Sequence, residues 1–235
     1  MPFLIIIAIL FLVYALLIIY YWRSWKAIPE FKASLPATDI TISVIIPARN
    51  EKENIGLLLN ALQQQNYPEH LTEIIVVDDH STDGTAGVVQ QFSFAKLVQL
   101  KEDSINSYKK KAIETGIAAS TGELIVTTDA DCIPGPGWLS VLAAFKKEKN
   151  SVFIAAPVVF VNNNSILQIF QSLDFLVLQG ITAASVYKNV HSMCNGANLA
   201  YEKKAFYEVN GFSGIDTIAS GEIAIRSAPF GYDVS

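Results

Sequence analysis

The sequence predicts an α/β protein in which a mostly parallel sheet carries helices on both faces and one transmembrane helix comes before it. Short, almost entirely apolar segments alternate with amphipathic segments along the 235-residue chain. This alternation is typical of parallel strands that are buried on both faces and connected by helices. The chain also starts with a long apolar run that contains no charged residue. This run predicts the transmembrane helix.

The apolar run extends from Phe3 to Trp22. About 20 helical residues, each rising about 1.5 Å, cross the roughly 30 Å hydrocarbon core of a bilayer. A cleaved signal peptide is the alternative, but no basic side chain precedes the run and the following RSWKAIPE offers no small-residue cleavage site. We therefore expect a transmembrane anchor over residues 1–26 and a linker over residues 27–40.

The end of the apolar run predicts how the chain is oriented in the membrane. Aromatic and basic side chains gather there: Tyr20, Tyr21, Trp22, Arg23, Trp25, Lys26 and Lys32. Aromatic residues prefer the membrane–water interface, and basic residues close to a span favour the cytoplasmic side. The sequence therefore predicts a single-pass protein of the cell (inner) membrane with its remaining residues in the cytoplasm.

Composition excludes two other classes of protein. The formal net charge is -5 and the isoelectric point is about 5.2, so the chain lacks the clustered basic surface of a nucleic-acid-binding protein. Cys132 and Cys194 show no metal-ligand spacing, which argues against a structural zinc site. We expect both to be free thiols in the reducing cytosol.

The strands and helices follow from hydrophobic periodicity. Apolar, β-branched segments predict strands at residues 41–47, 73–77, 95–100, 123–128 and 152–160, and CNGANLAY at 194–201 reads as a turn entering a strand. Amphipathic segments predict helices at residues 53–65, 83–92, 108–120 and 137–149, with a long apolar helix at 165–187. That last helix could lie on the bilayer, but burial against the sheet is the preferred interpretation.

Polar residues follow three of the predicted strands. The first strand leads into Arg49-Asn50-Glu51, the second ends in Asp78-Asp79, and the fourth ends in a D-x-D, Asp129-Ala130-Asp131. Ligands of open α/β sheets bind at the carboxyl ends of the strands, so these side chains are expected to converge. Clustered carboxylates repel one another unless a cation shares the site, and their oxygens suit Mg2+ or Mn2+.

A receiver-type phosphoacceptor pocket also carries an acidic pair after an apolar strand. That interpretation fits poorly, because a complete strand and helix precede Asp78-Asp79 and the next acidic strand end is a D-x-D. An isolated D-x-D could also be a simple turn, but its place in the strand order favours a metal site. His80 is interpreted as a loop residue. The basic run Lys109–Lys111 fits a solvated helix face or a phosphate contact equally well.

Four motifs in this order and spacing, VIIPARNE, IIVVDDHSTDGT, KKAIETGIAASTGELIVTTDADC and CNGANLAYEKKAFYEVNGF, resemble family 2 glycosyltransferases. The resemblance covers residues 41–222 and implies the inverting GT-A fold, a mostly parallel Rossmann-like sheet. It also implies that residues 41–131 bind the nucleotide-sugar and residues 132–222 form the acceptor side.

The resemblance assigns roles to particular residues. The loop that holds the donor nucleotide matches Pro47, Ala48, Asn50 and Glu51. The acid that reads the nucleobase, commonly uracil, matches Asp78 or Asp79, and Lys111 stands where the family often places a basic nucleotide or phosphate contact. Asp129 and Asp131 match the metal-binding D-x-D, with Asp131 as the more direct ligand of Mg2+ or Mn2+ and Asp129 nearer the ribose.

The implied reaction moves a sugar from a nucleoside diphosphate donor, with a UDP-sugar favoured, to a glycan or lipid-linked acceptor with inversion. The family takes its general base from an acidic pair beyond NGF, where Glu222 is present but Ile223 occupies the second acidic position. Glu222 is therefore the candidate base, and residues 223–235 form an atypical tail. Because the family's later segments are missing, the alternative is a truncated, catalytically impaired protein that binds nucleotide-sugar.

Overall fold

The computed structural model describes residues 2–32, 39–101, 108–160, 165–188, 190 and 196–213. These residues fall into two compact units. One unit contains the N-terminal helix and the long apolar helix, and the other contains the whole sheet with its covering helices.

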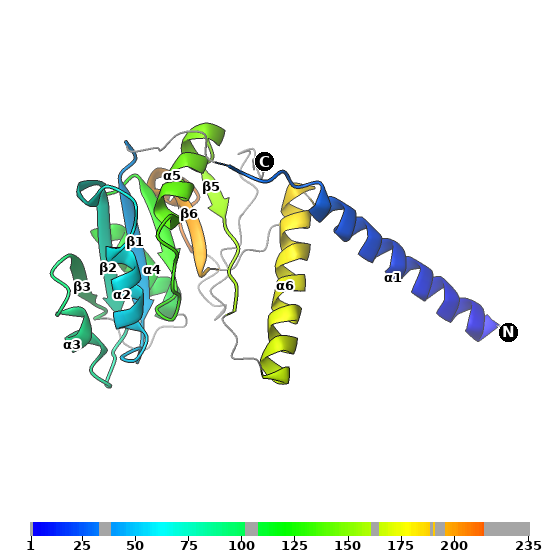
Figure 1. Ribbon diagram of the computed structural model, residues 1–235, viewed down its shortest axis with the longest axis horizontal. Coiled ribbons are helices and arrows are strands. Elements are labelled where there is room, and N and C mark those ends of the chain that lie inside the picture. The colour runs from blue at the N-terminus through cyan, green and yellow to red at the C-terminus, as the bar shows by residue number, and fades with distance from the viewer. Residues whose placement is uncertain are drawn as a thin grey trace. The chain divides into compact units, whose positions relative to one another are not determined.

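The sheet has six strands in the spatial order β3-β2-β1-β4-β6-β5 (Figure 1). In chain order they are β1 (Ile42–Ala48), β2 (Thr72–Asp78), β3 (Ala95–Gln99), β4 (Leu124–Thr128), β5 (Phe153–Ala155) and β6 (Asn198–Glu202). The four strands from β3 to β4 are parallel, whereas β6 runs antiparallel to both of its neighbours. The sheet is therefore mixed and mostly parallel, as the sequence predicts.

The strand register brings the predicted polar ends together. Ala48, the last residue of β1, pairs with Asp78, the last residue of β2. On the other side of β1, Ile45 pairs with Thr127, and two residues later β4 runs into the D-x-D. Because β1 lies between β2 and β4, all three ends lie along one edge of the sheet.

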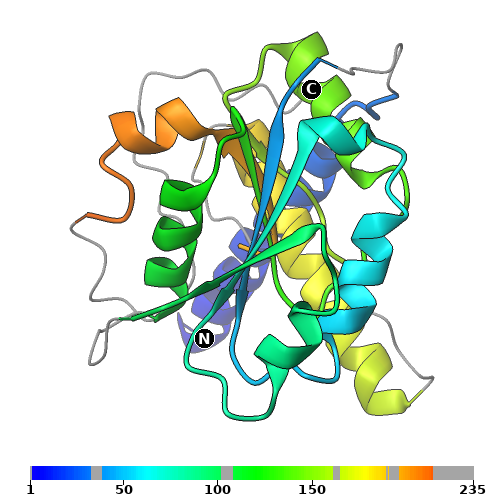
Figure 2. The same ribbon diagram turned by 90° about the vertical axis from the view of Figure 1, so that its left-hand side faces the viewer.

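Helices cover both faces of the sheet (Figure 2). Around the sheet lie α2 (Ile55–Gln63), the short α3 (Thr85–Val89), α4 (Tyr108–Ala119), α5 (Trp138–Lys149) and α7 (Lys203–Glu208). On one face, α4 and α7 pack on the strands around a core that includes Ile45, Ile113 and Phe206. On the other face, α2 and α5 bury their apolar sides. Burial on both faces explains why the parallel strands are almost wholly apolar.

Two details differ from the sequence-based expectation. The strand expected at residues 152–160 is limited to Phe153–Ala155, and Asn198 donates a hydrogen bond from its side-chain amide to the carbonyl of Pro157 just beyond it. Pro157 has no amide hydrogen to continue a ladder. The structure also contains α7 and a 3-10 turn at Glu69–Leu71 that the periodicity did not predict, because segments this short carry little periodic signal.

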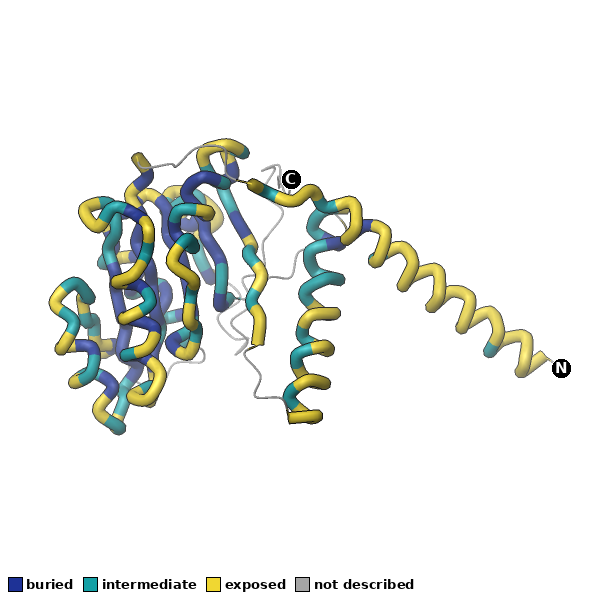
Figure 3. Tube along the Cα trace, in the orientation of Figure 1, coloured by how far each residue is buried: buried dark blue, intermediate teal, exposed yellow. Residues whose placement is uncertain are grey.

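The second unit contains α1 (Pro2–Lys26) and α6 (Ile166–Tyr187). Within the described residues, these two helices are long and apolar enough to cross a membrane. Nearly all of α1 is exposed, as Figure 3 shows. Many large apolar side chains of α6 are also exposed, among them Ile166, Phe170 and Leu173, and burial of this helix against the sheet stays a prediction.

Candidate functional site

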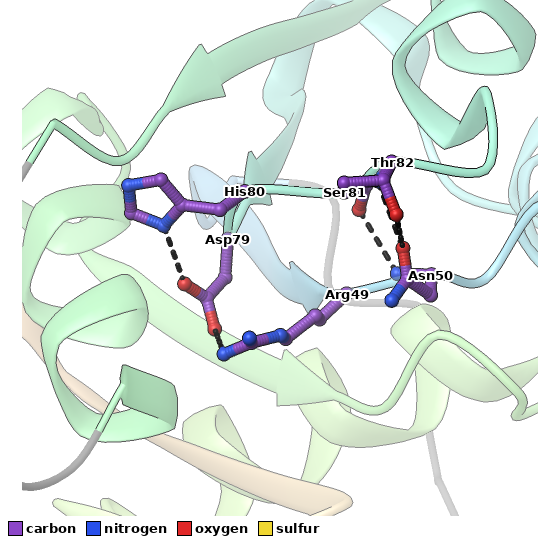
Figure 4. A network of polar contacts seen from close by, with 6 residues as sticks. All are labelled: Arg49, Asn50, Asp79, His80, Ser81 and Thr82. Atoms are coloured by element: carbon purple, nitrogen blue, oxygen red, sulfur yellow. Dashed lines mark hydrogen bonds and ion pairs between the residues drawn. The ribbon is translucent and has the colours of Figure 1, made fainter. Parts of the chain in front are cut away.

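The loop that follows β1 is held against the loop that follows β2. The amide of Asn50 donates to Ser81 Oγ at 2.9 Å, and Asn50 Oδ1 accepts a hydrogen bond from the amide of Thr82 at 2.9 Å (Figure 4). The amide of Glu51 donates to Thr85 Oγ1 at 2.9 Å. Asn50 itself has a φ of 56°, a left-handed conformation that Asn adopts more readily than most residues. These contacts fix the position of the predicted donor loop at the edge of the sheet.

Asp79 lies at the centre of a polar cluster at this edge. Arg49 Nη1 approaches Asp79 Oδ2 at 3.3 Å, and His80 Nδ1 lies 2.9 Å from Asp79 Oδ1 (Figure 4). The ring of Tyr108 completes the cluster, because Arg49 Cζ lies 5.2 Å from its centroid and the His80 ring meets it edge-on at 6.3 Å. Asp79 is only 5% exposed, but the side chains around it reach solvent.

Asp78 has a different environment from its neighbour. Its residue is 4% exposed, and its Oδ1 is buried without a hydrogen-bond partner in the part of the chain that the structure describes. Asp78 is the last residue of β2 and Asp79 is the first residue after it, and their two carboxylates have different surroundings. The carboxylate of Asp79 contacts the side chains of Arg49 and His80.

The D-x-D follows the buried end of β4. Asp129 Oδ1 accepts an ion-paired hydrogen bond from Lys109 Nζ at 2.6 Å. Asp131 is exposed, and Cys132 Sγ lies 3.9 Å from Asp131 Oδ1. Burial, with the negative charge of Asp131 as a further contribution, raises the pKa of the Cys132 thiol. The thiol is thus neutral near physiological pH.

These two carboxylates suit a cation that is shared with a substrate. No group of three or more His, Cys, Asp or Glu side chains that could hold an ion occurs among the described residues. Mg2+ is usually bound by one or two carboxylates while phosphates and waters complete its octahedron. Asp129 and Asp131 match that donor set, so the residues present fit the metal that the fold implies.

The start of α4 joins the two clusters. Tyr108 contacts Arg49 and His80, and the next residue, Lys109, pairs with Asp129. Lys111, predicted as the basic contact, is half-buried one half-turn further on, and Lys110 is buried. The basic run is therefore no uniform solvated face, and within it Lys109 contacts the D-x-D through Asp129.

The CNGANLAY motif approaches the same edge from the other side. Asn198 at the start of β6 pairs with Thr128 at the end of β4. Trp138 Nε1 donates to Asn198 Oδ1 at 2.9 Å, and Thr127 Oγ1 donates to the carbonyl of Gly196 at 3.0 Å. Asn198 thereby connects the strand of the D-x-D with α5.

The structure describes some of the remaining predicted site residues, whereas others lie outside the described residues. Pro47 and Ala48 are the last residues of β1, and the carbonyl of Ala48 accepts from the amide of Asp79 at 2.8 Å. The candidate base Glu222 and its neighbour Ile223 lie outside the described residues, as does Cys194.

Comparison with known proteins identifies the family. A sequence model described as glycosyl transferase family 2 matches residues 43–209, which is most of the chain. The chain belongs to this family. It is 27% identical over 222 residues to the probable glycosyltransferase YdaM of Bacillus subtilis, and the match covers 92% of the chain and 53% of YdaM. The chain thus spans about half the length of this relative.

Solved structures agree with the fold. The mannosyltransferase PcManGT from Pyrobaculum calidifontis, in complex with GDP-Man and Mn2+, superposes with a TM-score of 0.64 at 24% identity, over 83% of this chain and 54% of that one. TarS of Staphylococcus aureus, in complex with UDP-GlcNAc, superposes with a TM-score of 0.53 at 23% identity, over 73% and 48%. The predicted GT-A fold of this family 2 member is confirmed.

Sequence reasoning missed four side chains of the site. Arg49 and His80 are in the quoted motifs, and their places beside acidic strand ends are the only signal that could have singled them out. Tyr108 has no such signal. Lys109 was noticed only as part of a run of three lysines, which gives no indication of which lysine faces the D-x-D.

Proposed function

We propose that this family 2 glycosyltransferase moves a sugar from a nucleoside diphosphate to a lipid-linked or polysaccharide acceptor with inversion of the anomeric centre. The observation that carries the proposal is the arrangement around the start of α4. There Tyr108 joins the Asp79 cluster, and Lys109 pairs with Asp129. Groups suited to a nucleoside and groups suited to a diphosphate thus lie next to each other.

The nucleoside is bound at the ends of β1 and β2 in this proposal. Pro47, Ala48, Asn50 and Glu51 form the supporting loop, and Asp79 is the carboxylate that accepts from the nucleobase. We assign this role to Asp79 because Arg49 and His80, both partly exposed, meet it, whereas Asp78 Oδ1 is buried. A ring N–H of uracil is a suitable donor to this carboxylate.

The diphosphate is bound beside the D-x-D. Asp131, which is exposed, and Asp129 hold Mg2+ or Mn2+, and Lys109 offers its ammonium to a phosphate oxygen. When bound by Asp129 and Asp131, such a cation would supply Lewis-acid stabilisation of negative charge on the diphosphate. Lys109 contributes positive charge to the same oxygen atoms, which is the type of electrostatic stabilisation that lowers barriers to phosphate departure.

The acceptor hydroxyl attacks the anomeric carbon from the face opposite the diphosphate, so the configuration inverts. A carboxylate within hydrogen-bond reach removes the hydroxyl proton as the carbon–oxygen bond forms. Glu222 is the proposed base. We further propose that α1 anchors the protein in the cell membrane with the catalytic domain in the cytoplasm, because the basic residues Arg23 and Lys26 lie at the end of α1 that leads to the sheet.

Calorimetry on the full chain in nanodiscs tests donor binding, with UDP and GDP titrated in the presence and absence of Mn2+. The structures of relatives contain either a GDP-sugar or a UDP-sugar, and we expect UDP to bind more tightly here. Asp131→Asn should abolish the Mn2+-dependent part of the affinity. Absence of metal-dependent binding by the unchanged chain would refute the proposal.

Donor turnover tests the catalytic step and the alternative of an impaired protein. Glu222→Gln should lower the rate of UDP release in the presence of a membrane lipid extract by about 10² to 10⁴, while the affinity for UDP stays constant. Turnover that survives in Glu222→Gln would remove Glu222 from the mechanism. Normal nucleotide binding without any turnover by the unchanged chain would favour the impaired protein.

A further inference from the structure

One side of α6 is a continuous apolar face. Its members recur at helical spacing and point to the same side: Ile166, Ile169, Phe170, Leu173, Leu176 and Val177. In the structure these six side chains are between 42% and 88% exposed. A helix of a soluble protein turns such a face toward its core.

The opposite side of α6 is the covered one. Gln168, Ser172, Phe175 and Gln179 lie on it and are only partly exposed. The ring of Phe175 meets that of Phe160 at a centroid distance of 4.6 Å. The apolar face of the helix is therefore exposed, whereas its more polar side is partly covered. Contiguous exposed apolar surfaces of this kind mark sites of interaction with membranes or other proteins.

The contact between α6 and α1 indicates which of these covers the face. The two helices belong to one unit and contact each other. Their buried residues are Ser24 of α1 and the pair Ala184 and Ser185 of α6, all near the C-terminal ends, and Figure 1 shows the helices meeting there while the rest of α6 diverges from α1. α6 thus meets α1 at one end only.

That end of α1 is the one that belongs at the membrane surface. Its last turns carry Tyr20, Tyr21, Trp22 and Trp25 together with Arg23 and Lys26. Aromatic belts and basic residues mark the level of the lipid headgroups. Since α6 leaves α1 at this level and does not run beside its apolar length, α6 starts from the membrane surface.

We propose that the apolar face of α6 is inserted into the headgroup–acyl boundary of the bilayer that α1 crosses, so that α6 lies in the plane of the membrane as a second lipid contact. An amphipathic helix of this length binds an interface by burying its apolar side to a depth of about 5–10 Å. The inference rests on the proposed anchoring by α1.

The polar residues of α6 argue against the other arrangement, a second membrane crossing. Asp174 lies near the middle of the helix, and Gln168, Gln171 and Gln179 are distributed along its length. In a crossing helix, Asp174 would lie near the bilayer centre, where a carboxylate is rare and needs a polar partner. In an in-plane helix, the exposed side chains of Gln171 and Asp174 remain close to water.

Spin labels on single cysteines test the proposal in the full chain, with Cys132→Ser and Cys194→Ser as the background. The chain is reconstituted in vesicles of phosphatidylcholine and phosphatidylglycerol, and the depth of each label is measured from its accessibility to oxygen and to a water-soluble nickel chelate. Labels at Ile166→Cys, Phe170→Cys, Leu173→Cys and Val177→Cys report the apolar face. Gln171→Cys, on the other side of the same helix, is the matched control.

We expect the four apolar-face labels to lie at one common depth below the headgroups and the Gln171→Cys label to remain accessible to the nickel chelate. A depth that changes steadily from position 166 to 177, by up to about 1.5 Å per residue, would show a membrane crossing and overturn the proposal. Free access of the nickel chelate to all positions would also overturn it. So would exclusion of both reagents, which would show that protein covers the face.

A label at Leu10→Cys in α1 separates the two proposals. If this label lies deep in the bilayer while the α6 labels are aqueous, the anchor holds and only the inference about α6 is wrong. If the Leu10→Cys label is itself aqueous, the anchoring proposal fails. Every labelled chain is also titrated with UDP and Mn2+, because an unchanged affinity shows that the sheet unit is still folded.

Discussion

Lys109 Nζ lies 2.6 Å from Asp129 Oδ1, so the second residue of α4 closes onto the first carboxylate of the D-x-D. Both side chains remain partly exposed. The ammonium therefore balances the charge of Asp129 and is within reach of an anion that binds at the same edge. In the proposed function, Lys109 Nζ exchanges the carboxylate oxygen of Asp129 for a phosphate oxygen when a nucleoside diphosphate binds.

Replacing Lys109 should weaken binding of the nucleoside diphosphate. Lys109→Met keeps much of the aliphatic stem but removes a hydrogen bond between charged groups, which typically contributes about 1.5–3 kcal/mol, or at least a tenfold change in Kd. Lys111→Met is the matched control and should have a much smaller effect. Calorimetry with UDP and Mn2+ measures both, and a larger loss in Lys111→Met would restore the original assignment of the basic contact to Lys111.

The two adjacent aspartates can be separated in the same way. Asp79→Asn removes the charge that faces Arg49 and His80 and should lower the affinity for UDP by about tenfold or more, because its hydrogen bond to the nucleobase loses a charged acceptor. Asp78→Asn should leave this affinity close to that of the unchanged chain. If the two effects are reversed, Asp78 is the residue that meets the base.

Much of the sheet could be predicted from sequence because buried parallel strands are continuous apolar runs, and the positions of β1, β2 and β4 followed directly. The strand order is harder to predict from sequence, because the place of β6 between β4 and β5 depends on pairing between residues more than 40 positions apart. The distinction between Lys109 and Lys111 depends on where α4 points. Residues two apart differ by about 200° around a helix, so a run of lysines conceals which one faces the site.

The surroundings of α6 are hard to predict from sequence for a related reason. Its periodicity predicted the helix and the members of its apolar face correctly. The same pattern, however, occurs both in a helix that is buried in a protein core and in a helix that faces lipid, because both surroundings are apolar. Only the structure shows that the face formed by Ile166, Phe170, Leu173 and their neighbours is exposed.

A polar network at the opposite edge of the sheet should govern stability in acid. Glu73 Oε2 accepts hydrogen bonds from Ser43 Oγ at 2.7 Å and from the amide of Thr121 at 2.8 Å. Burial opposes ionisation of Glu73, but the hydrogen bonds of Ser43 and Thr121 outweigh it and lower the pKa of the carboxyl group. The network ties β1, β2 and the turn before β4 together.

The sign of the pH dependence follows from the lowered pKa of Glu73. The folded state prefers the ionised form, so the stabilisation is fully present above the unfolded pKa of about 4.3 and is lost as the pH falls through the folded pKa. Glu73→Gln should therefore lower the thermal midpoint at pH 7 and have a progressively smaller effect below about pH 4. The measurement is the thermal midpoint of both chains in detergent at each pH of this range. A difference between the two midpoints that stays the same at every pH would show that Glu73 makes no such contribution.

Gly122 lies in the same network, and its missing side chain is required there. Its amide donates to Ser43 Oγ at 2.9 Å, and a Cβ at this position would lie 2.7 Å from the backbone nitrogen of Ser43. The backbone of β1 is fixed by both neighbouring strands and cannot withdraw. Gly122→Ala should therefore cost about 1–3 kcal/mol of stability, the usual range for overpacking.

In Gly87→Ala, the matched control inside α3, the new Cβ meets nothing within 4 Å, and the gain in helix propensity should stabilise the protein by up to about 1 kcal/mol. Urea unfolding of both variants distinguishes the effects, and an equal response at the two positions would mean that the approach of Gly122 to β1 is not what limits this site.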